Sequence, residues 1–373
     1  MKLQNKVRAN SKGLTHCNET AGNPSPPCSY TPSHPRLCRY AALTAFTTLL
    51  LLWMGGLVTS HEAGMAVPDW PTTYGYNMFF FPFSHWAGNI FYEHTHRLIA
   101  SAVGFMTIIL VVWLWLKEPR RWVCWLGVGA LLAVIVQGIL GGLRVTEMMD
   151  ELGIFHATLA QLFFVLVAAI ALFTSRWWFE ASRTPAIRAD GLRRIYLATA
   201  ALIFLQLIIA ATMRHQHAGL AIPDFPLVYG KIWPAVDSDS ILRFNQMRTE
   251  IMTANPITAF QVELQMVHRL VAMLILAAIL TAAWKTKKFL GWNSLLTKIS
   301  LAAVGLIAIQ ILLGAATIWT NKSADIATAH VAVGALSFLA AVMLVLVSWR
   351  TLEAPVKAPA PVPLPIELQP KRT

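Results

Sequence analysis

The segment Ala63-Gly-Met-Ala-Val-Pro-Asp-Trp-Pro-Thr-Thr-Tyr-Gly75 decides the architecture of this protein. A near copy of it returns as Ala218-Gly-Leu-Ala-Ile-Pro-Asp-Phe-Pro-Leu-Val-Tyr-Gly230. The two segments align without a gap, and eight of their thirteen positions are identical. Three of the remaining positions are near matches, namely Met with Leu, Val with Ile, and Trp with Phe. Such a match predicts that the chain contains the same structural unit twice.

The match continues on the C-terminal side of both segments. Three further correspondences follow in the same order: His96-Arg-Leu-Ile-Ala100 with His268-Arg-Leu-Val-Ala272, Val136-Gln-Gly-Ile-Leu-Gly141 with Ile309-Gln-Ile-Leu-Leu-Gly314, and His156 with His330. The offset between matching residues grows from 155 to 172–174, so the second copy is predicted to carry a longer outer loop.

The composition assigns both copies to a membrane. Of the 373 residues, 56% are hydrophobic and 13% are charged, about half the roughly 25% charged residues of soluble domains. Four cysteines in so long a chain exclude a secreted disulfide scaffold, and the apolar excess excludes a disordered chain. Eight apolar stretches approach the roughly 20 residues that cross a bilayer: Ala41–Val58, Leu98–Leu116, Trp122–Leu143, Leu152–Ser175, Ile195–Met213, Leu264–Trp284, Ile299–Asn321 and Ile326–Trp349.

The basic residues alternate between the connections of these stretches. One set of segments, which includes both termini, holds 22 Lys and Arg residues, whereas the opposite set holds 6. The positive-inside rule therefore predicts that both termini are cytoplasmic. The net charge of +12 is then mainly an orientation signal, and no nucleic-acid partner is expected.

The predicted fold is an all-α integral membrane protein with eight transmembrane helices. Each copy contains four spans, an even number, so both copies enter the membrane from the same side. The halves are therefore expected to form two four-helix bundles related by a pseudo-two-fold axis along the membrane normal. The expected parts are a cytoplasmic tail (1–40), an N-terminal half (41–175), a cytoplasmic linker (176–194), a C-terminal half (195–349) and a Pro-rich cytoplasmic tail (350–373).

Four of the eleven histidines repeat as pairs. His96 and His268 lie in the first turns of the second span of each half, and His156 and His330 in those of the fourth. Two neutral imidazoles that face each other across a bundle supply both axial ligands of a haem iron. A single such histidine is more often bonded to a neighbouring helix, but four in register favour two haem sites. Zinc fits less well, because each half repeats only two nitrogen ligands and no thiolate.

Glu93 breaks the symmetry between the halves. It precedes His96 by three residues, so the two side chains share a helix face if the helix begins early enough. The matching residue in the second half is Gln265, which cannot ionise. A carboxylate beside one site alone indicates different roles for the two halves. The alternative interpretation of Glu93 is an acid at a helix N-terminus, where the helix dipole favours it.

Other repeated polar residues have structural interpretations beside functional ones. Arg97 and Arg269 are expected either to pair with haem propionates or to extend to the membrane interface. Gln137 and Gln310 lie in the middle of their spans and are expected to join neighbouring helices.

The repeated loops themselves are expected to be structural. Asp69 and Asp224 are predicted to bond the backbone amides of their own turns, while the loops fold back over the outer ends of the bundles. Four histidines without a repeated partner are assigned to outer loops and expected to be solvated: His61, His85, His215 and His217.

Several motifs together resemble one family. They are Glu93-His-Thr-His-Arg97, Gln265-Met-Val-His-Arg269, the repeated Ala-Gly-x-Ala-x-Pro-Asp-x-Pro loops and the His156/His330 pair, and together they resemble haem A synthase. The resemblance covers residues 41–349. It implies a membrane enzyme that oxidises the methyl group at porphyrin C8 of haem O to a formyl group, which makes haem A for terminal oxidases.

The resemblance also implies roles for individual residues. His96 and His156 would hold the substrate, haem O. His268 and His330 would hold a permanent haem b that passes electrons. Glu93 would be the catalytic acid.

The same resemblance implies the surroundings of the protein. It suggests the cell inner or plasma membrane as its location, with lipid around it, and haem O synthase and oxidase assembly factors as protein partners. Some members of the family carry a cysteine pair in the outer loops, and this sequence has none there. A mechanism that requires such a disulfide therefore cannot operate here.

Two other functions are compatible with the repeat. A quinol-linked cytochrome b that carries electrons between two haems would explain the four histidines but leave Glu93 unexplained. A transporter would explain the repeat, but transporters typically contain broken helices in the middle of the membrane, which these uninterrupted stretches lack. Extraction of the pigment distinguishes the three functions. A haem A synthase should yield haem A or O beside haem b, an electron carrier haem b alone, and a transporter no haem.

Overall fold

A computed structural model describes residues 34–186, 189–247 and 256–353. Eight of its helices are long and apolar enough to cross a membrane, which confirms the predicted all-α fold with eight spans. They are α1 (Pro35–Ser60), α2 (Gly88–Lys117), α3 (Arg121–Thr146), α4 (Asp150–Thr174), α6 (Ala189–His215), α8 (Ala259–Leu290), α9 (Leu295–Trp319) and α10 (Ala324–Thr351). Most of the two predicted tails lies outside the described residues.

The connections contain short elements. These are the 3₁₀ helices η1 (Met78–Phe80), η2 (Phe83–His85) and η3 (Ala218–Leu220), the helices α5 (Arg176–Glu180) and α7 (Ser238–Gln246), and the strands β1 (Thr184–Pro185) and β2 (Leu352–Glu353). β1 pairs in parallel with β2, so the linker between the halves is joined to the end of α10. Arg350 adds to this joint, because its Nε donates to the carbonyl of Trp178 at 2.7 Å.

Local signals explain where the spans begin and end. α1 begins six residues before the predicted apolar stretch, because Pro35 is already fixed in a helical φ at the first helical position. α8 begins with a capping box, in which Thr258 and Gln261 each accept a hydrogen bond from the backbone amide of the other. It ends at Gly291, whose φ of 76° is a conformation that glycine adopts without strain.

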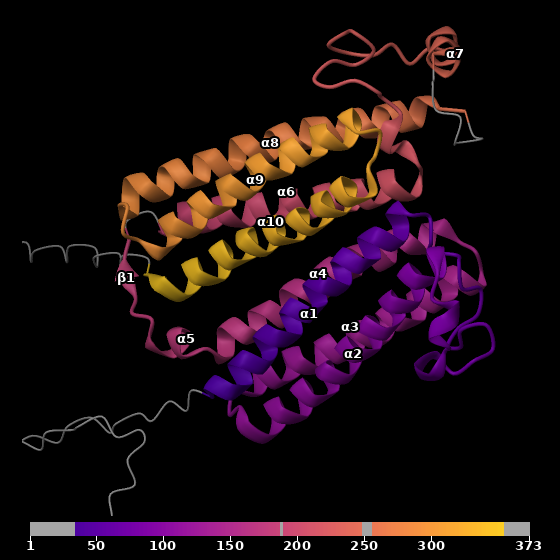
Figure 1. The fold of residues 1–373 in the computed structure, drawn as a ribbon. Coiled ribbons are helices and arrows are strands. Elements are labelled where there is room, and N and C mark those ends of the chain that lie inside the picture. The colour runs from indigo at the N-terminus through magenta and orange to yellow at the C-terminus, as the bar shows by residue number, and fades with distance from the viewer. Residues whose placement is uncertain (1–33, 187–188, 248–255, 354–373) are drawn as a thin grey trace, which may run out of the picture. The chain divides into compact units, whose positions relative to one another are not determined.

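The helices pack in the same pattern in both halves (Figure 1). In the first, α1 contacts α2 and α4, and α3 contacts the same two helices; in the second, α6, α8, α9 and α10 repeat this ring. Between the halves, α1 packs on α10 and α4 packs on α6. α1 and α6 are the first spans of their halves, and α4 and α10 are the last. If each first span is exchanged with the other, and each last span likewise, the contact between α1 and α10 becomes the contact between α6 and α4. This pattern is consistent with the expected pseudo-two-fold relation.

The apolar core lies along the helices where the halves meet. α4 and α10 are the most buried of the eight spans, and α9 is the least. The peripheral helices instead present large apolar side chains outward, such as Phe105 on α2, which is 65% exposed, and Leu312 on α9, which is 63% exposed. Such surfaces suit hydrocarbon rather than water, as expected for a multi-pass membrane protein.

Candidate haem sites in the two bundles

The repeated loops adopt the same local structure in both halves. The Asp69 carboxylate accepts hydrogen bonds from the backbone amides of Tyr74 and Gly75, at 2.7 and 2.8 Å. Asp224 accepts the equivalent bonds from Tyr229 and Gly230, at 2.7 and 2.9 Å. The expectation that these aspartates bond their own turns is therefore confirmed.

The environment of Asp69 favours its charged form. Burial raises the pKa of the Asp69 carboxyl, but hydrogen bonds from Gly75, Thr72 and Tyr74 outweigh burial and hold that pKa below its usual value. The bond from Thr72 Oγ1 is 2.5 Å long. The turn therefore depends on an ionised carboxylate.

The arginines that follow the repeated histidines hold these loops in place. Arg97 donates from Nη1 to the carbonyls of Asp69 and Thr72, at 2.7 and 3.0 Å, and from Nη2 to the carbonyl of Val67, at 2.8 Å. Arg269 donates to the carbonyls of Asp224 and Leu227, at 2.7 and 3.0 Å. The sequence did not predict these contacts with the loop. The arginines connect the second span of each half to the loop above it.

The four repeated histidines form two pairs. The His96 ring interacts electrostatically with the His156 ring between α2 and α4, and His268 interacts in the same way with His330 between α8 and α10. In all four rings Nδ1 is buried and has no hydrogen-bond partner. A backbone group of a neighbouring helix lies beside three of the rings without completing a hydrogen bond: that of Leu51 beside His96, Gln137 beside His156 and Gln310 beside His330.

Glycines let the neighbouring helices approach three of these rings. A Cβ atom added at Gly55 on α1 would lie 3.1 Å from Cε1 of His96, and one at Gly314 on α9 would lie 3.1 Å from Cε1 of His330. At Gly141 on α3 the distance to Cε1 of His156 would be 3.3 Å. Because a methyl group at any of these positions is in tight contact with an imidazole, the glycines help to fix how the rings are oriented.

Glutamines fix the backbone of two of the histidines. Gln137 donates from Nε2 to the carbonyl of His156 at 2.9 Å, so its expected role between helices is confirmed. Gln206, which sequence reasoning did not single out, donates in the same way to the carbonyl of His268 at 2.9 Å. Gln310 instead lies against Gly334 on α10, where its Nε2 would be 3.2 Å from an added Cβ atom.

These donor sets fit haem better than a bare metal ion. Each bundle offers two imidazoles to one iron, and a porphyrin supplies the other four nitrogens. Within the described residues, no group of three or more His, Cys, Asp or Glu side chains gathers as a zinc site would require. The assignment of the four histidines as axial ligands remains a prediction that these contacts support.

Glu93 and Gln265 differ in their bonds as well as their chemistry. Glu93 is 4% exposed and bonds Nη2 of Arg97 through Oε1 at 2.9 Å, while its Oε2 is buried and the backbone of Ala66 lies beside the carboxylate without completing a hydrogen bond to that oxygen. Gln265 is 3% exposed, but its Oε1 accepts from the Ile222 amide at 2.7 Å and its Nε2 donates to the Gly219 carbonyl at 3.3 Å. Glu93 is the sixth residue of α2, beyond the first turn, so the helix dipole does not account for it.

Two further histidines have surroundings that the sequence did not predict. His215, expected to be solvated, is 8% exposed and lies against Gly153 on α4, because it is the last residue of α6 rather than part of a loop. His94 is fully buried, with Nδ1 3.2 Å from Thr73 Oγ1 and its ring against Phe81.

Sequence reasoning also assigned no role to Arg144. This residue lies in the last turn of α3 and interacts electrostatically with both His96 and His156. The available signal was its position, because it is the single Lys or Arg among residues 59–92 and 144–151, the outer connections of the first half.

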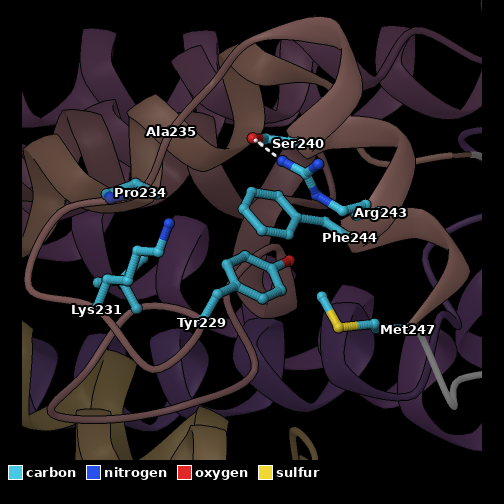
Figure 2. Close-up of a pocket in the computed structure, with 9 residues that line it drawn as sticks. Tyr229, Lys231, Pro234, Ala235, Ser240, Arg243, Phe244 and Met247 are labelled. Atoms are coloured by element: carbon cyan, nitrogen blue, oxygen red, sulfur yellow. Dashed lines mark hydrogen bonds between the residues drawn. The ribbon is translucent and has the colours of Figure 1, made fainter.

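The longer outer loop predicted for the second half contains α7 and a small pocket (Figure 2). The Tyr229 and Phe244 rings stack there with centroids 3.6 Å apart, and Arg243 donates to Ser240 Oγ at 2.9 Å. The pocket volume is about 180 Å³, and none of the repeated histidines lines it. It is therefore separate from the candidate haem sites.

The chain is similar to known proteins over most of its length. A family model described as cytochrome oxidase assembly protein matches residues 38–342. A heme A synthase of Halalkalibacterium halodurans is 26% identical over 325 residues, which cover 85% of this chain and 98% of that protein. A heme A synthase of Geobacillus kaustophilus is 26% identical over 86% of this chain and 93% of its own length. A heme A synthase of Beijerinckia indica is 27% identical over 74% of this chain and 82% of its own length.

Proposed function

The chain belongs to the haem A synthase family of cytochrome oxidase assembly proteins, and from this premise we propose that it oxidises the C8 methyl group of haem O to a formyl group. The family makes it an oxidoreductase that is associated with haem. Its eight apolar helices agree with a substrate that is itself soluble in the membrane.

The observation that carries the proposal is the unpartnered Oε2 of Glu93. A buried carboxylate oxygen without a partner is costly, so such atoms are retained where a substrate or a proton completes them. At the matching position, both ends of the Gln265 amide form hydrogen bonds with the loop, to Ile222 and Gly219. The proposal therefore places the reaction in the N-terminal half.

In that half, His96 and His156 hold the substrate by its iron. Gly55 and Gly141 support the two rings from the neighbouring helices, so both imidazoles would meet the substrate in a defined orientation. The loop that Arg97 ties down lies over the outer end of α2. Exclusion of water at this end protects the partly oxidised carbon from side reactions.

Glu93 is the proton acceptor in this proposal. The formyl carbon is four electrons more oxidised than the methyl carbon, so each oxidation step must also dispose of protons. Arg97 holds Oε1, so Oε2 is the oxygen that would take up the proton. A glutamine at this position could accept a hydrogen bond but could not take up a proton.

The C-terminal half would hold haem b between His268 and His330, and a haem bound there would supply one-electron transfer. Gln206 and Gly314 fix the backbone of one ligand and the ring of the other. The absence of a carboxylate at Gln265 suits a haem that passes electrons without a change to its periphery. We place the protein in the cell inner or plasma membrane with both termini cytoplasmic, and expect haem O synthase and oxidase assembly factors as its partners.

Co-expression with a source of haem O tests this function. The full chain is produced beside a haem O synthase, and the extracted haems are separated by chromatography. Haem A beside haem b is the expected result, with an empty vector as the control. Haem b alone, with haem O left unconverted, would instead support an electron carrier.

A further inference from the structure

Arg144 is a buried cation at the outer end of the N-terminal bundle. Its side chain is 17% exposed, and its Nε atom is buried without a hydrogen-bond partner. The ion-pair partner that the structure gives it is Asp150, whose Oδ1 lies 3.7 Å from Nη2 and whose side chain is 47% exposed. A guanidinium with a free donor and one distant, solvated partner can accept a further anion.

The surroundings of Arg144 connect it to the candidate substrate site. It interacts electrostatically with His96, His156 and Glu93, the residues proposed to hold and oxidise the substrate. Gly141, one turn earlier on the same face of α3, lies against the His156 ring, so Arg144 is on the side of α3 that faces the histidines.

No other cation of this half is free at that end. The N-terminal half has five Lys and Arg residues, and three of them lie at the opposite end of the bundle: Lys117, Arg120 and Arg121. Arg97 is at the outer end, but each of its terminal nitrogens already donates to two acceptors in the loop and in Glu93. Among these five residues, Arg144 alone therefore has donors left for a further anion, while Arg214 of the other half, at the same end, has Nη2 bonded to Gly56 and Ser60.

The second half is arranged differently, because its buried guanidinium beside His330 is Arg214 of α6, which donates to the carbonyl of Gly56 and to Ser60 Oγ of α1. The residue that matches Arg144 is Thr317, whose Oγ1 donates to the carbonyl of Leu313 at 2.8 Å. The loops differ in the same way, because a Cβ atom added at Gly64 would lie 2.8 Å from Nη1 of Arg144, whereas one at the matching Gly219 would meet nothing within 4 Å. The guanidinium is thus held against the loop in one half only.

We propose that Arg144 binds a propionate carboxylate of the haem substrate and so determines which edge of the porphyrin faces Glu93. This inference rests on the proposed function. The C8 methyl group shares its pyrrole ring with a propionate, so a fixed propionate also fixes the methyl group that reacts. A carboxylate in a membrane protein needs such a partner, and guanidinium binds it with two parallel hydrogen bonds. Arg144 is a positioning residue in this role.

Binding of a porphyrin with and without its carboxylates tests the inference. The probes are iron protoporphyrin IX and its dimethyl ester, titrated into the purified full chain that already contains haem b and followed by absorption. His96→Ala identifies the signal of the N-terminal site. We expect the free acid to bind about 10- to 100-fold more tightly than the ester, as for a hydrogen bond to a charged group. Arg144→Gln should remove this preference without weakening the ester.

Matched variants keep the result interpretable. Thr317→Val, at the matching position, should keep the wild-type preference for the acid. If Arg144→Gln does not fold, Gly64→Ala displaces the guanidinium and should reduce the preference, whereas Gly219→Ala should not. A wild-type protein without preference for the acid, or an Arg144→Gln protein that keeps it, would overturn the inference. If Arg144→Gln loses the preference for the acid but the wild-type protein makes no haem A from haem O, the role of Arg144 in binding is supported and the proposed function is refuted.

Discussion

Glu93 and Gln265 occupy matching positions but complete their hydrogen bonds differently. The carboxylate keeps one oxygen free, whereas the amide uses both of its ends on the loop above it. A free buried oxygen is a cost to stability that a purely structural residue would not need. The oxidation is therefore expected to depend on the N-terminal half, and the retention of haem b on the C-terminal half.

Substitution of Glu93 by Gln should stop the reaction but not the binding. Without a general base the rate should fall about 10²- to 10⁴-fold, while the protein still binds haem b and haem O. The measurement is the yield of haem A at matched protein level. Gln265→Glu is the control, because a second acid in the other half should not raise that yield. A yield near wild type for Glu93→Gln would make Glu93 a structural partner of Arg97.

The histidines of the second half should be required for its haem. His268→Ala and His330→Ala each remove one axial ligand, so the low-spin bis-histidine absorption spectrum of haem b should be lost. His217→Ala is the control, because that side chain is 56% exposed and lies outside both pairs. Normal bis-histidine spectra in both alanine variants would show that other residues bind the iron.

At the scale of elements, the spacing between helices determines how the ligands are held. Gly314 and Gly305 lie on the same helix, α9, yet an added Cβ atom would crowd the His330 ring at the first and meet nothing within 4 Å at the second. The glycine beside the ring is thus part of the site, whereas the other glycine is not.

Gly314→Ala should therefore disturb the haem of the second half. The extra methyl group pushes against Cε1 of His330, and overpacking of this kind costs about 1–3 kcal/mol. The expected result is weaker haem retention and an altered low-spin spectrum. Gly305→Ala should leave both unchanged. Equal spectra for the two variants would mean that α9 moves away at little cost.

The outer loop of the first half should lose stability in acid. The pKa of Asp69 is lowered in the folded protein, so its contribution is present above the unfolded value of about 3.9 and is lost as the pH falls through the lower folded value. Hydrogen exchange of the loop amides tests this. Asp69→Asn should exchange faster than wild type at neutral pH, and the difference should shrink below pH ~4. A difference that does not depend on pH would exclude the charge as its cause.

At the scale of the whole molecule, the 22 to 6 division of basic residues predicts the orientation in the membrane. Reporter fusions within 176–194 should report a cytoplasmic location, and fusions within 59–87 an outer one. Both loops are long enough to be tested directly. An outer location for 176–194 would reverse the orientation and with it the side from which haem is reached.

Much of the molecule could be predicted from the order of its residues. Eight apolar stretches define eight spans because the cost of an unbonded backbone in lipid leaves few alternatives to a helix. The repeat predicts two similar halves, and the His96 and His156 positions predict which helices face each other. These features depend on composition and spacing along the chain, which a sequence displays directly.

Tertiary structure alone decided the partners of the long polar side chains. Arg97 could have met a propionate or the interface, and it instead binds carbonyls of the loop 25–30 positions earlier in the chain. Arg144 comes near both histidines because α3 packs against α2 and α4, the helices that carry them. A guanidinium reaches several ångströms from its backbone, so its neighbours depend on how the helices and loops pack and not on spacing within one helix.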